Sequence, residues 1–264
     1  MSTPDRVITS RSHDLVKRCR SIARGDERLA LLDGWHLLDD ALGSDVRLIT
    51  VAVTAPLDGT ASRVLSHAAS RGAEIIRVSN QVMEALSPVR TPTGVISIVE
   101  RKFSDLSELW LPEPALVVVA ADMQDPGNVG ALIRAAEAGG ATGVALTGAS
   151  ADPWSWKALR AAMGSTMRCP VLRTRDSDSL IASIRARAVR LLATVPRGGT
   201  LLYRADLTKP VAILVGGEGA GLAEAIVDSA DERVSIPMRA PVDSLNAAVA
   251  AALFVYEAQR QRNK

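Results

Sequence analysis

Short apolar runs alternate with amphipathic stretches along the chain from Arg28 onward. This alternation is typical of α/β proteins, in which helices cover both faces of a largely parallel sheet. The spacing of the apolar residues therefore predicts an α/β fold. In the first hundred residues it predicts helices over 13–24, 35–42 and 61–71, a short helix capped by Ser79, and strands over 28–32, 48–53, 74–78 and 95–99.

The second part of the chain contains the longer apolar runs. Residues 115–121 form a continuous apolar segment bounded by turn signals, as expected of a central strand in a parallel sheet. The helix predicted over 245–261 has almost only apolar residues from Ala247 to Tyr256, so we expect it to be buried. Between these segments the pattern predicts strands over 143–147, 171–173, 190–194, 211–215 and 234–236, and helices over 128–138, 153–164, 179–188 and 221–230.

Periodicity is lost between Glu100 and Pro114, where charged residues and two prolines are typical of a short linker. A chain of 264 residues is long enough for two modest domains. We therefore expect a first domain over 1–104, a linker over 105–114 and a second domain over 115–264.

Composition narrows the class of protein. The chain has 31 Lys and Arg against 29 Asp and Glu, so a surface that attracts nucleic acid must be local. Its two cysteines, Cys19 and Cys169, lie far apart and without metal-ligand spacing, which disfavours a disulfide framework and a zinc site. No apolar run approaches the ~20 residues of a membrane span, and we expect a cytoplasmic protein without a membrane partner.

Three segments carry candidate chemistry, and the first is residues 122–134. It lies where a predicted strand ends and a helix begins, which is where ligands bind in open α/β sheets. Asn128 is placed to cap the helix, and Arg134 lies in an otherwise apolar stretch. A turn, a cap and a solvated charge would also explain these residues. Asp122 and Asp125 lack the second acid pair or metal spacing that acid–base or metal chemistry would need.

The second segment, L-V-G-G-E-G-A-G-L over 214–222, is a glycine loop between a predicted strand and helix, which allows backbone N–H groups to approach a ligand. Its glycine spacing matches neither a dinucleotide fingerprint nor a P-loop, which disfavours a nucleotide-dependent oxidoreductase. Glu218 is either a turn carboxylate or a partner for a basic group. The third segment, 236–246, ends with Ser244 and Asn246 at the start of the last helix, where backbone N–H groups are free.

Together the three segments resemble the SpoU (TrmH-like) branch of RNA ribose methyltransferases. They match its motifs in order and content, as N-x-x-x-x-x-R, G-x-E-G-x-G-L, and I-P-M…S-L-N before an alanine-rich helix. The first hundred residues resemble the family's substrate-binding domain, which is similar to ribosomal protein L30e, through LLDGWHLLDDAL and SPVRTPTGVISIV. Three departures, Gly217, the Ala247-Ala248 pair and Asp33, concern specificity rather than activity.

The resemblance implies a second domain with a deep trefoil knot, a homodimer formed through that domain, and S-adenosylmethionine as cofactor, without a metal. The reaction would be transfer of the methyl group to a ribose 2′-hydroxyl of RNA. Arg134 would assist removal of the hydroxyl proton or stabilise the developing alkoxide. The implied catalytic residues are Asn128, Arg134, Glu218, Ser244 and Asn246. The implied cofactor-binding residues are Thr194, Gly216, Gly217, Glu218, Ile236, Leu245 and Asn246.

A basic leading helix and a second basic segment are the predicted RNA contacts, because clustered Lys and Arg bind phosphates. They comprise Arg6, Arg11, Lys17, Arg18, Arg20, Arg24, Lys157 and Arg160. The accessory domain favours ribosomal RNA over transfer RNA, and no DNA partner is expected. Two alternatives stay open, a tRNA 2′-O-methyltransferase and a non-catalytic RNA-binding or ribosome-assembly protein.

Overall fold

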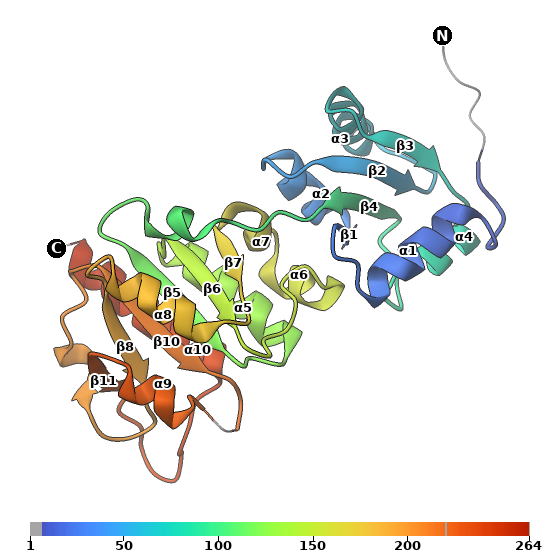
Figure 1. The fold of residues 1–264 in the computed structure, drawn as a ribbon. Helices are drawn as coiled ribbons and strands as arrows, with labels where there is room; N and C mark the ends of the chain where they lie inside the picture. The colour runs from blue at the N-terminus through green and yellow to red at the C-terminus, as the bar shows by residue number, and fades with distance from the viewer. Residues whose placement is uncertain (1–6, 220, 264) are drawn as a thin grey trace. The chain divides into compact units, whose positions relative to one another are not determined.

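The computed structural model describes residues 7–219 and 221–263 (Figure 1). It divides into two compact units, Met1–Lys102 with Trp154–Met167, and Phe103–Pro153 with Arg168–Lys264. Each unit contains one β-sheet, and both have the predicted α/β character. Within the described ranges, none of the helices has the length and apolarity needed to cross a membrane.

The first unit contains a four-stranded sheet in the order β1 (Leu29–Asp33), β4 (Val95–Glu100), β2 (Leu48–Val53) and β3 (Glu74–Arg77). The two pairs that involve β4 are antiparallel and the β2–β3 pair is parallel. Because successive strand residues face opposite sides, Leu32 packs with one apolar cluster and Leu31 with the other. Around the sheet are α1 (Asp14–Arg24), α2 (Trp35–Leu42), α3 (Gly59–Ser70) and α4 (Asn80–Leu86).

One helical segment joins this unit from the middle of the sequence. It comprises α6 (Trp156–Ala162) and most of α7 (Ser165–Arg168). Trp154, Leu159 and Met167 are buried in the same apolar cluster as the residues of α2, and the indole N–H of Trp154 donates to the Lys102 carbonyl at 3.1 Å. The sequence placed this segment in the second domain, because its position between two strands gave no sign that its apolar face packs elsewhere.

The second unit contains a seven-stranded parallel sheet (Figure 1). The strands follow the order β7 (Val171–Arg173), β6 (Gly143–Thr147), β5 (Leu116–Ala121), β10 (Val211–Gly216), β8 (Arg190–Thr194), β11 (Glu232–Ser235) and β9 (Thr200–Leu201). The helices of this unit are η1 (Leu106–Trp110), α5 (Pro126–Ala138), α8 (Ser177–Arg185), η2 (Leu202–Arg204), α9 (Glu224–Asp228) and α10 (Ala247–Arg262).

The central strand β5 is buried on both faces, as its continuous apolar run predicts. Leu116 and Val118 pack in a cluster with residues of α5 and α10. Val117 packs on the opposite face, in a cluster that contains residues of α8 and η1. The predicted linker contributes to this second cluster, because Leu109 and Trp110 of η1 are buried there. The charged residues of this segment suggested a linker, although Leu109 and Trp110 within it are buried.

The last helix is only partly buried in the single chain. Phe254 and Val255 are buried against the sheet, but Val249, Leu253 and Tyr256 are 49%, 41% and 49% exposed. An almost entirely apolar helix therefore leaves one apolar face uncovered in the single chain. The trefoil knot implied by the resemblance stays a prediction.

Candidate active site

Two of the candidate segments meet at the carboxyl edge of the parallel sheet. Strands β5 and β10 are neighbours, with Ala121 opposite Gly216 in register. The backbones of the two strands remain hydrogen-bonded one residue beyond the end of β10, since the Gly217 N–H donates to the Ala121 carbonyl at 2.8 Å. The segments that follow the two strands, which carry Asn128 and Glu218, therefore start side by side.

Helix α5 is capped by Asp125 rather than by the predicted Asn128. The Asp125 carboxylate accepts a hydrogen bond of 2.8 Å from the Asn128 backbone N–H, and Pro126 occupies the first turn. Because Asp125 satisfies the helix end, the side chain of Asn128 is free to bind elsewhere.

The side chains of all three segments join in one hydrogen-bonded chain. The Asn128 amide nitrogen Nδ2 donates to Oε1 of Glu218, and Nδ2 of Asn246 donates to Oδ1 of Asn128 at 3.0 Å. Oδ1 of Asn246 in turn accepts from the backbone N–H groups of Ala248 and Val249, at 3.0 and 3.3 Å, and so caps α10. The partner of Glu218 is thus an amide, not the basic group that the sequence suggested.

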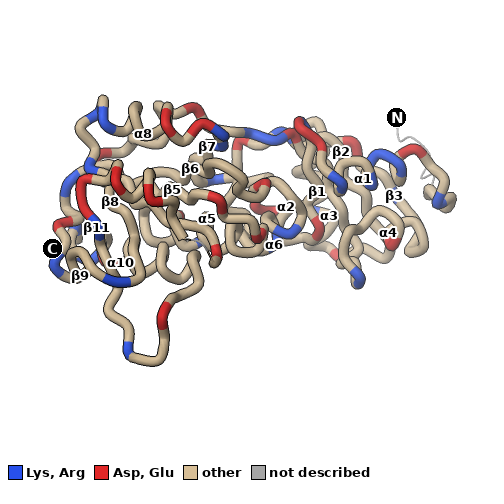
Figure 2. Tube along the Cα trace, turned by 60° about the horizontal axis from the view of Figure 1, so that its bottom comes forward, with Lys and Arg blue, Asp and Glu red and all other residues tan. Residues whose placement is uncertain are grey.

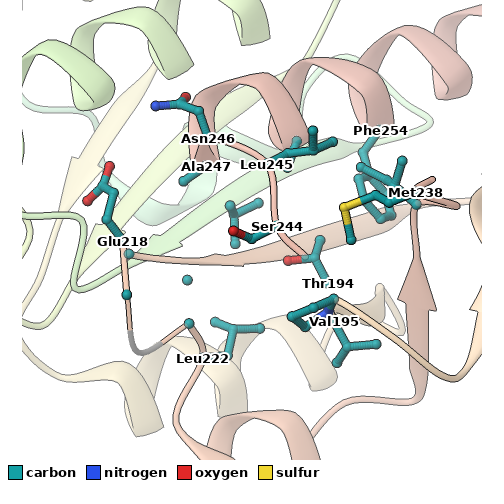
Figure 3. Close-up of a pocket in the computed structure, with 18 of the residues that line it drawn as sticks. Thr194, Val195, Glu218, Leu222, Met238, Ser244, Leu245, Asn246, Ala247 and Phe254 are labelled. Carbon is teal, nitrogen blue, oxygen red and sulfur yellow. The ribbon is translucent and has the colours of Figure 1, made fainter. Parts of the chain in front are cut away.

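A cavity of about 470 Å³ lies beside this chain (Figure 3). In the figure Glu218 and Asn246 lie at one end of the cavity, and Met238 lies at the other. Its walls are the glycine loop, the segment after β8, the loop 236–246 and the first turns of α10. All seven residues predicted to bind the cofactor line it, namely Thr194, Gly216, Gly217, Glu218, Ile236, Leu245 and Asn246, and Ser244 lines it as well.

Beyond Ile236 and Leu245, sequence reasoning missed most of the apolar residues of the lining. Leu222, Met238 and Phe254 belong to it, together with Val195 and Pro196. Single aliphatic and aromatic residues in a chain that is 47% hydrophobic look like ordinary core residues. From the residues alone, only the glycines of the loop 216–221 and the predicted strand ends indicated that a ligand site lies in this part of the chain.

At two of its positions the glycine loop is packed too tightly for a side chain. A Cβ atom on Gly216 would lie 2.2 Å from the carbonyl carbon of Gly221, and one on Gly217 would lie 2.2 Å from the backbone oxygen of Asp122. Both neighbours are backbone atoms, so neither can move aside easily. In this chain the loop therefore needs glycine at both positions, including Gly217, which departs from the family motif.

Arg134 does not line this cavity. It is exposed on α5, and it makes no hydrogen bond or ion pair with the part of the chain that the structure describes. The structure thus brings Asn128, Glu218, Ser244 and Asn246 together at one place and leaves the predicted catalytic arginine outside it.

The predicted RNA-binding residues differ in their surroundings. Arg11 pairs with Glu84 at 2.9 Å and Lys17 with Asp14 at 3.0 Å. Arg18, Arg20 and Arg24 on α1 are exposed and have no acidic partner among the described residues. Figure 2 shows Lys and Arg positions of α1 in blue. In the segment that joins the first unit, Lys157 lies 5.6 Å from the centre of the Trp156 ring, and Arg160 is exposed. Arg6 lies outside the described residues.

The remaining candidate groups do not suggest other chemistry. Burial raises the pKa of both Cys19 and Cys169 to about 12, so the thiols stay protonated at neutral pH. Among residues 7–219 and 221–263, no group of three His, Cys, Asp or Glu side chains could hold a metal ion.

A pocket at the carboxyl edge of a parallel sheet, in a chain with a separate small α/β unit, is the arrangement of an RNA ribose methyltransferase of the class that the motifs resemble. Residues 115–256 match the SpoU rRNA Methylase family, and residues 15–97 match the MRM3-like substrate binding domain. The chain belongs to the SpoU rRNA methylase family.

Three relatives illustrate the match. The chain is 30% identical to the 23S rRNA (guanosine(2553)-2′-O)-methyltransferase RlmP of Bacillus subtilis, over 94% of this chain and 97% of the relative. It is 34% identical to the 23S rRNA (uridine(2479)-2′-O)-methyltransferase of Streptomyces viridochromogenes, over 73% of this chain and 69% of the relative. The AdoMet-bound rRNA methyltransferase from Sinorhizobium meliloti superposes with a TM-score of 0.87 at 30% identity, with 97% of each chain covered.

These findings confirm the predicted class, an S-adenosylmethionine-dependent RNA 2′-O-methyltransferase, and its cofactor. The residues of the pocket fit this group. Its volume lies within the range of small-molecule sites, roughly 300–1,000 Å³. At Gly219 and Gly221, which line the pocket, a Cβ would meet no atom within 4 Å, so the main chain of the loop is open to a ligand there.

Proposed function

We propose that this protein methylates a ribose 2′-hydroxyl of 23S ribosomal RNA in the cytoplasm. The observation that carries the proposal is the hydrogen-bonded chain of Glu218, Asn128 and Asn246 beside the glycine-lined pocket. The relatives from Bacillus subtilis and Streptomyces viridochromogenes, both named as 23S rRNA 2′-O-methyltransferases, support the choice of RNA.

The residues of the pocket serve mainly to position the reactants. S-adenosylmethionine, when bound, supplies a methyl group on a positively charged sulfur, which an attacking oxygen can accept without a metal. Asn128 is held from both ends, by Glu218 and by Asn246, so its orientation is fixed before RNA binds. A fixed carboxamide can orient the incoming ribose, and such orientation lowers the entropic part of the barrier. Ser244 adds a hydroxyl to the pocket wall.

We infer that the protein acts as a homodimer through α10. Val249, Leu253 and Tyr256 lie at helical positions i, i+4 and i+7, so they share one face. Exposed apolar side chains in a row are typical of an interface, and a twofold contact would cover this face in both copies. Helix α5 packs along α10, where Gly139 lies against Val255 and Tyr256.

Arg134 acts from the second copy in this proposal. It projects from α5 but does not line the pocket of its own chain. In the dimer its guanidinium would stabilise the alkoxide that develops in the partner's site. A mixed dimer of Arg134→Ala and Asn246→Ala chains tests this directly. Activity returns in the mixed dimer if Arg134 serves the partner's pocket, and stays absent if it serves its own.

We assign RNA binding to the first unit. Arg18, Arg20 and Arg24 have no competing acidic partner in the described chain, which leaves their charges available for phosphates. Arg11 and Lys17 are already neutralised by acidic neighbours, so they contribute less.

The test is transfer of labelled methyl from S-adenosylmethionine to unmodified 23S rRNA and to unmodified tRNA, with the product mapped by its alkali-resistant linkage. A 2′-O-methyl group in 23S rRNA, absent with the Asn246→Ala variant, is the expected result. Transfer to tRNA alone would contradict the choice of RNA. Cofactor binding without transfer to either RNA would favour a non-catalytic RNA-binding role.

A further inference from the structure

A second cavity, of about 620 Å³, adjoins the cofactor pocket. The two share Gly217, Glu218 and Gly221 as lining residues, so the glycine loop forms a wall between them. The other lining residues of the second cavity are Asp122, Gln124, Asp125 and Asn128. It thus opens next to the fixed carboxamide of Asn128, where the proposed reaction takes place.

The charge of this cavity excludes a phosphate site. Three carboxylates line it, and no Lys, Arg or His belongs to its described lining. A phosphate group would be repelled there, because like charges at close range are unfavourable. The part of the nucleotide that enters must instead offer hydrogen-bond donors.

Each of the three carboxylates is held in place by one oxygen. Oδ1 of Asp122 accepts from the Ala149 backbone N–H at 2.8 Å, and Oδ1 of Asp125 accepts from the Asn128 backbone N–H at 2.8 Å. Oε1 of Glu218 accepts from the side chain of Asn128. The second oxygen of each carboxylate makes no hydrogen bond with the described residues. Ionised carboxylates only accept hydrogen bonds, so the cavity presents oriented acceptors.

Gln124 is the one lining side chain that offers donors and is not engaged. It is exposed, and its carboxamide makes no hydrogen bond with the described part of the chain. A carboxamide provides two N–H donors and one acceptor oxygen. The cavity therefore combines several fixed acceptors with one adaptable donor.

We propose that this cavity receives the base of the target nucleotide and selects guanine, with Gln124 as a specificity-determining residue. Guanine alone among the four RNA bases has two adjacent donors on its Watson–Crick edge, N1–H and N2–H₂, beside the acceptor O6. The guanine N1–H and N2–H₂ groups would donate hydrogen bonds to the carboxylate oxygens that have no partner in the described chain. Guanine O6 would accept one from the side-chain N–H₂ of Gln124. Proteins that act on single nucleotides commonly read this edge after the base has left its stack.

The other bases fit this cavity less well. Uracil carries two carbonyl oxygens on either side of N3–H, and these would face carboxylates. Cytosine and adenine each present a single amino donor with ring acceptors. The three carboxylates are exposed, so the discrimination rests on their charge, which repels the carbonyl oxygens of a wrong base and favours N–H donors. The two named relatives modify guanosine and uridine, so family membership does not determine the base.

The inference rests on the proposed function, and the first step of its test maps the methylated nucleotide in unmodified 23S rRNA. The expected target is a guanosine, and a target with any other base would overturn the inference. The second step replaces that guanosine by inosine, which lacks only the N2 amine, in a synthetic RNA that spans the mapped position. We expect kcat/KM to fall roughly tenfold or more, because one hydrogen bond to a carboxylate is lost.

A pair of glutamine variants tests the role of Gln124. We expect Gln124→Ala to lower kcat/KM for the guanosine RNA about fivefold or more, with cofactor affinity unchanged, since Gln124 does not line the cofactor pocket. Gln81→Ala, at an exposed glutamine on α4, is the matched control and should keep the wild-type kcat/KM for the guanosine RNA. An equal rate for guanosine and inosine would contradict the inference. Absence of methyl transfer to any RNA would instead contradict the proposed function.

Discussion

The side-chain amide of Asn246 donates a 3.0 Å hydrogen bond to the side-chain oxygen of Asn128, 118 residues earlier in the chain. The same asparagine caps α10 through its own side-chain oxygen. One residue therefore both starts the last helix and orients the polar side chain of the first motif. These two tasks can be separated by substitution, because they use different atoms of the carboxamide.

Replacing Asn246 by Asp keeps the acceptor that caps α10 but removes the N–H donor to Asn128. We expect Asn246→Asp to retain nearly the wild-type free energy of unfolding and to lose most methyl transfer. Asn246→Ala loses both interactions and should also be less stable by about 1 kcal/mol, the usual value of a helix cap. Urea unfolding and the labelled-methyl assay measure the two effects. Equal activity in Asn246→Asp and wild type would refute the positioning role.

Substitution of Gly216 tests the cradle of the cofactor pocket. A Cβ there would meet the backbone of Gly221 and Leu222 at 2.2 and 2.4 Å, so the loop must shift. We expect Gly216→Ala to weaken S-adenosylmethionine binding at least tenfold in calorimetry and to destabilise the protein by ~1–3 kcal/mol, as overpacking usually does. Gly59→Ala is the control, since a Cβ at Gly59 meets no atom within 4 Å. Unchanged cofactor affinity in Gly216→Ala would show that the cradle does not bind the cofactor.

Arg262 anchors the end of α10 to two separate segments of the chain. Its guanidinium donates to the carbonyl oxygens of Leu207, Pro114, Ala115 and Lys209, at 2.9, 2.7, 3.0 and 2.9 Å. Partial burial lowers the pKa of this guanidinium from its ordinary value, and the four carbonyl oxygens accept hydrogen bonds from it.

We expect Arg262→Ala to lower the free energy of unfolding by roughly 2–4 kcal/mol, because partly buried carbonyls lose a charged donor. Arg262→Lys should recover only part of this, since an ammonium lacks the planar fork that reaches several acceptors. Arg18→Ala, which removes an exposed charge without a partner, should change the stability little. Thermal and urea unfolding measure all three variants, and equal stability of Arg262→Ala and wild type would contradict the anchor.

The basic face of α1 predicts a salt-dependent contribution to RNA affinity. We expect a variant in which Arg18, Arg20 and Arg24 are replaced by Ala to bind RNA more weakly and with a smaller dependence on salt, by about 0.7 in log–log slope for each lost contact to single-stranded RNA. Arg11→Ala should change the slope less, because Glu84 already neutralises Arg11. Cofactor affinity serves as the control and should stay the same. If the salt dependence of RNA affinity is unchanged in the triple variant, α1 does not contact the RNA.

The parts of this fold and site that were predictable have strong local signals. The resemblance of the motifs to the family implied seven residues that line one pocket, and the uninterrupted apolar run of β5 indicated a central strand. The rest depended on tertiary partners. The choice of Asp125 over Asn128 as cap, the burial of Trp110 and the packing of α6 in the first unit are decided by neighbours that are distant in sequence. The apolar composition of α10 predicts burial but does not identify the covering surface, and in the single chain Val249, Leu253 and Tyr256 stay exposed.

The hydrogen-bonded chain at the site also has a kinetic consequence. Its two links join residues that are 90 and 118 positions apart. Contacts between such distant residues require large loops to close first, and they are intrinsically slow to form. The site can therefore assemble only after the strands on both sides of it have paired. In a refolding experiment, helical signal should return before cofactor binding, so that methyl-transfer activity reports completed folding of the whole second unit.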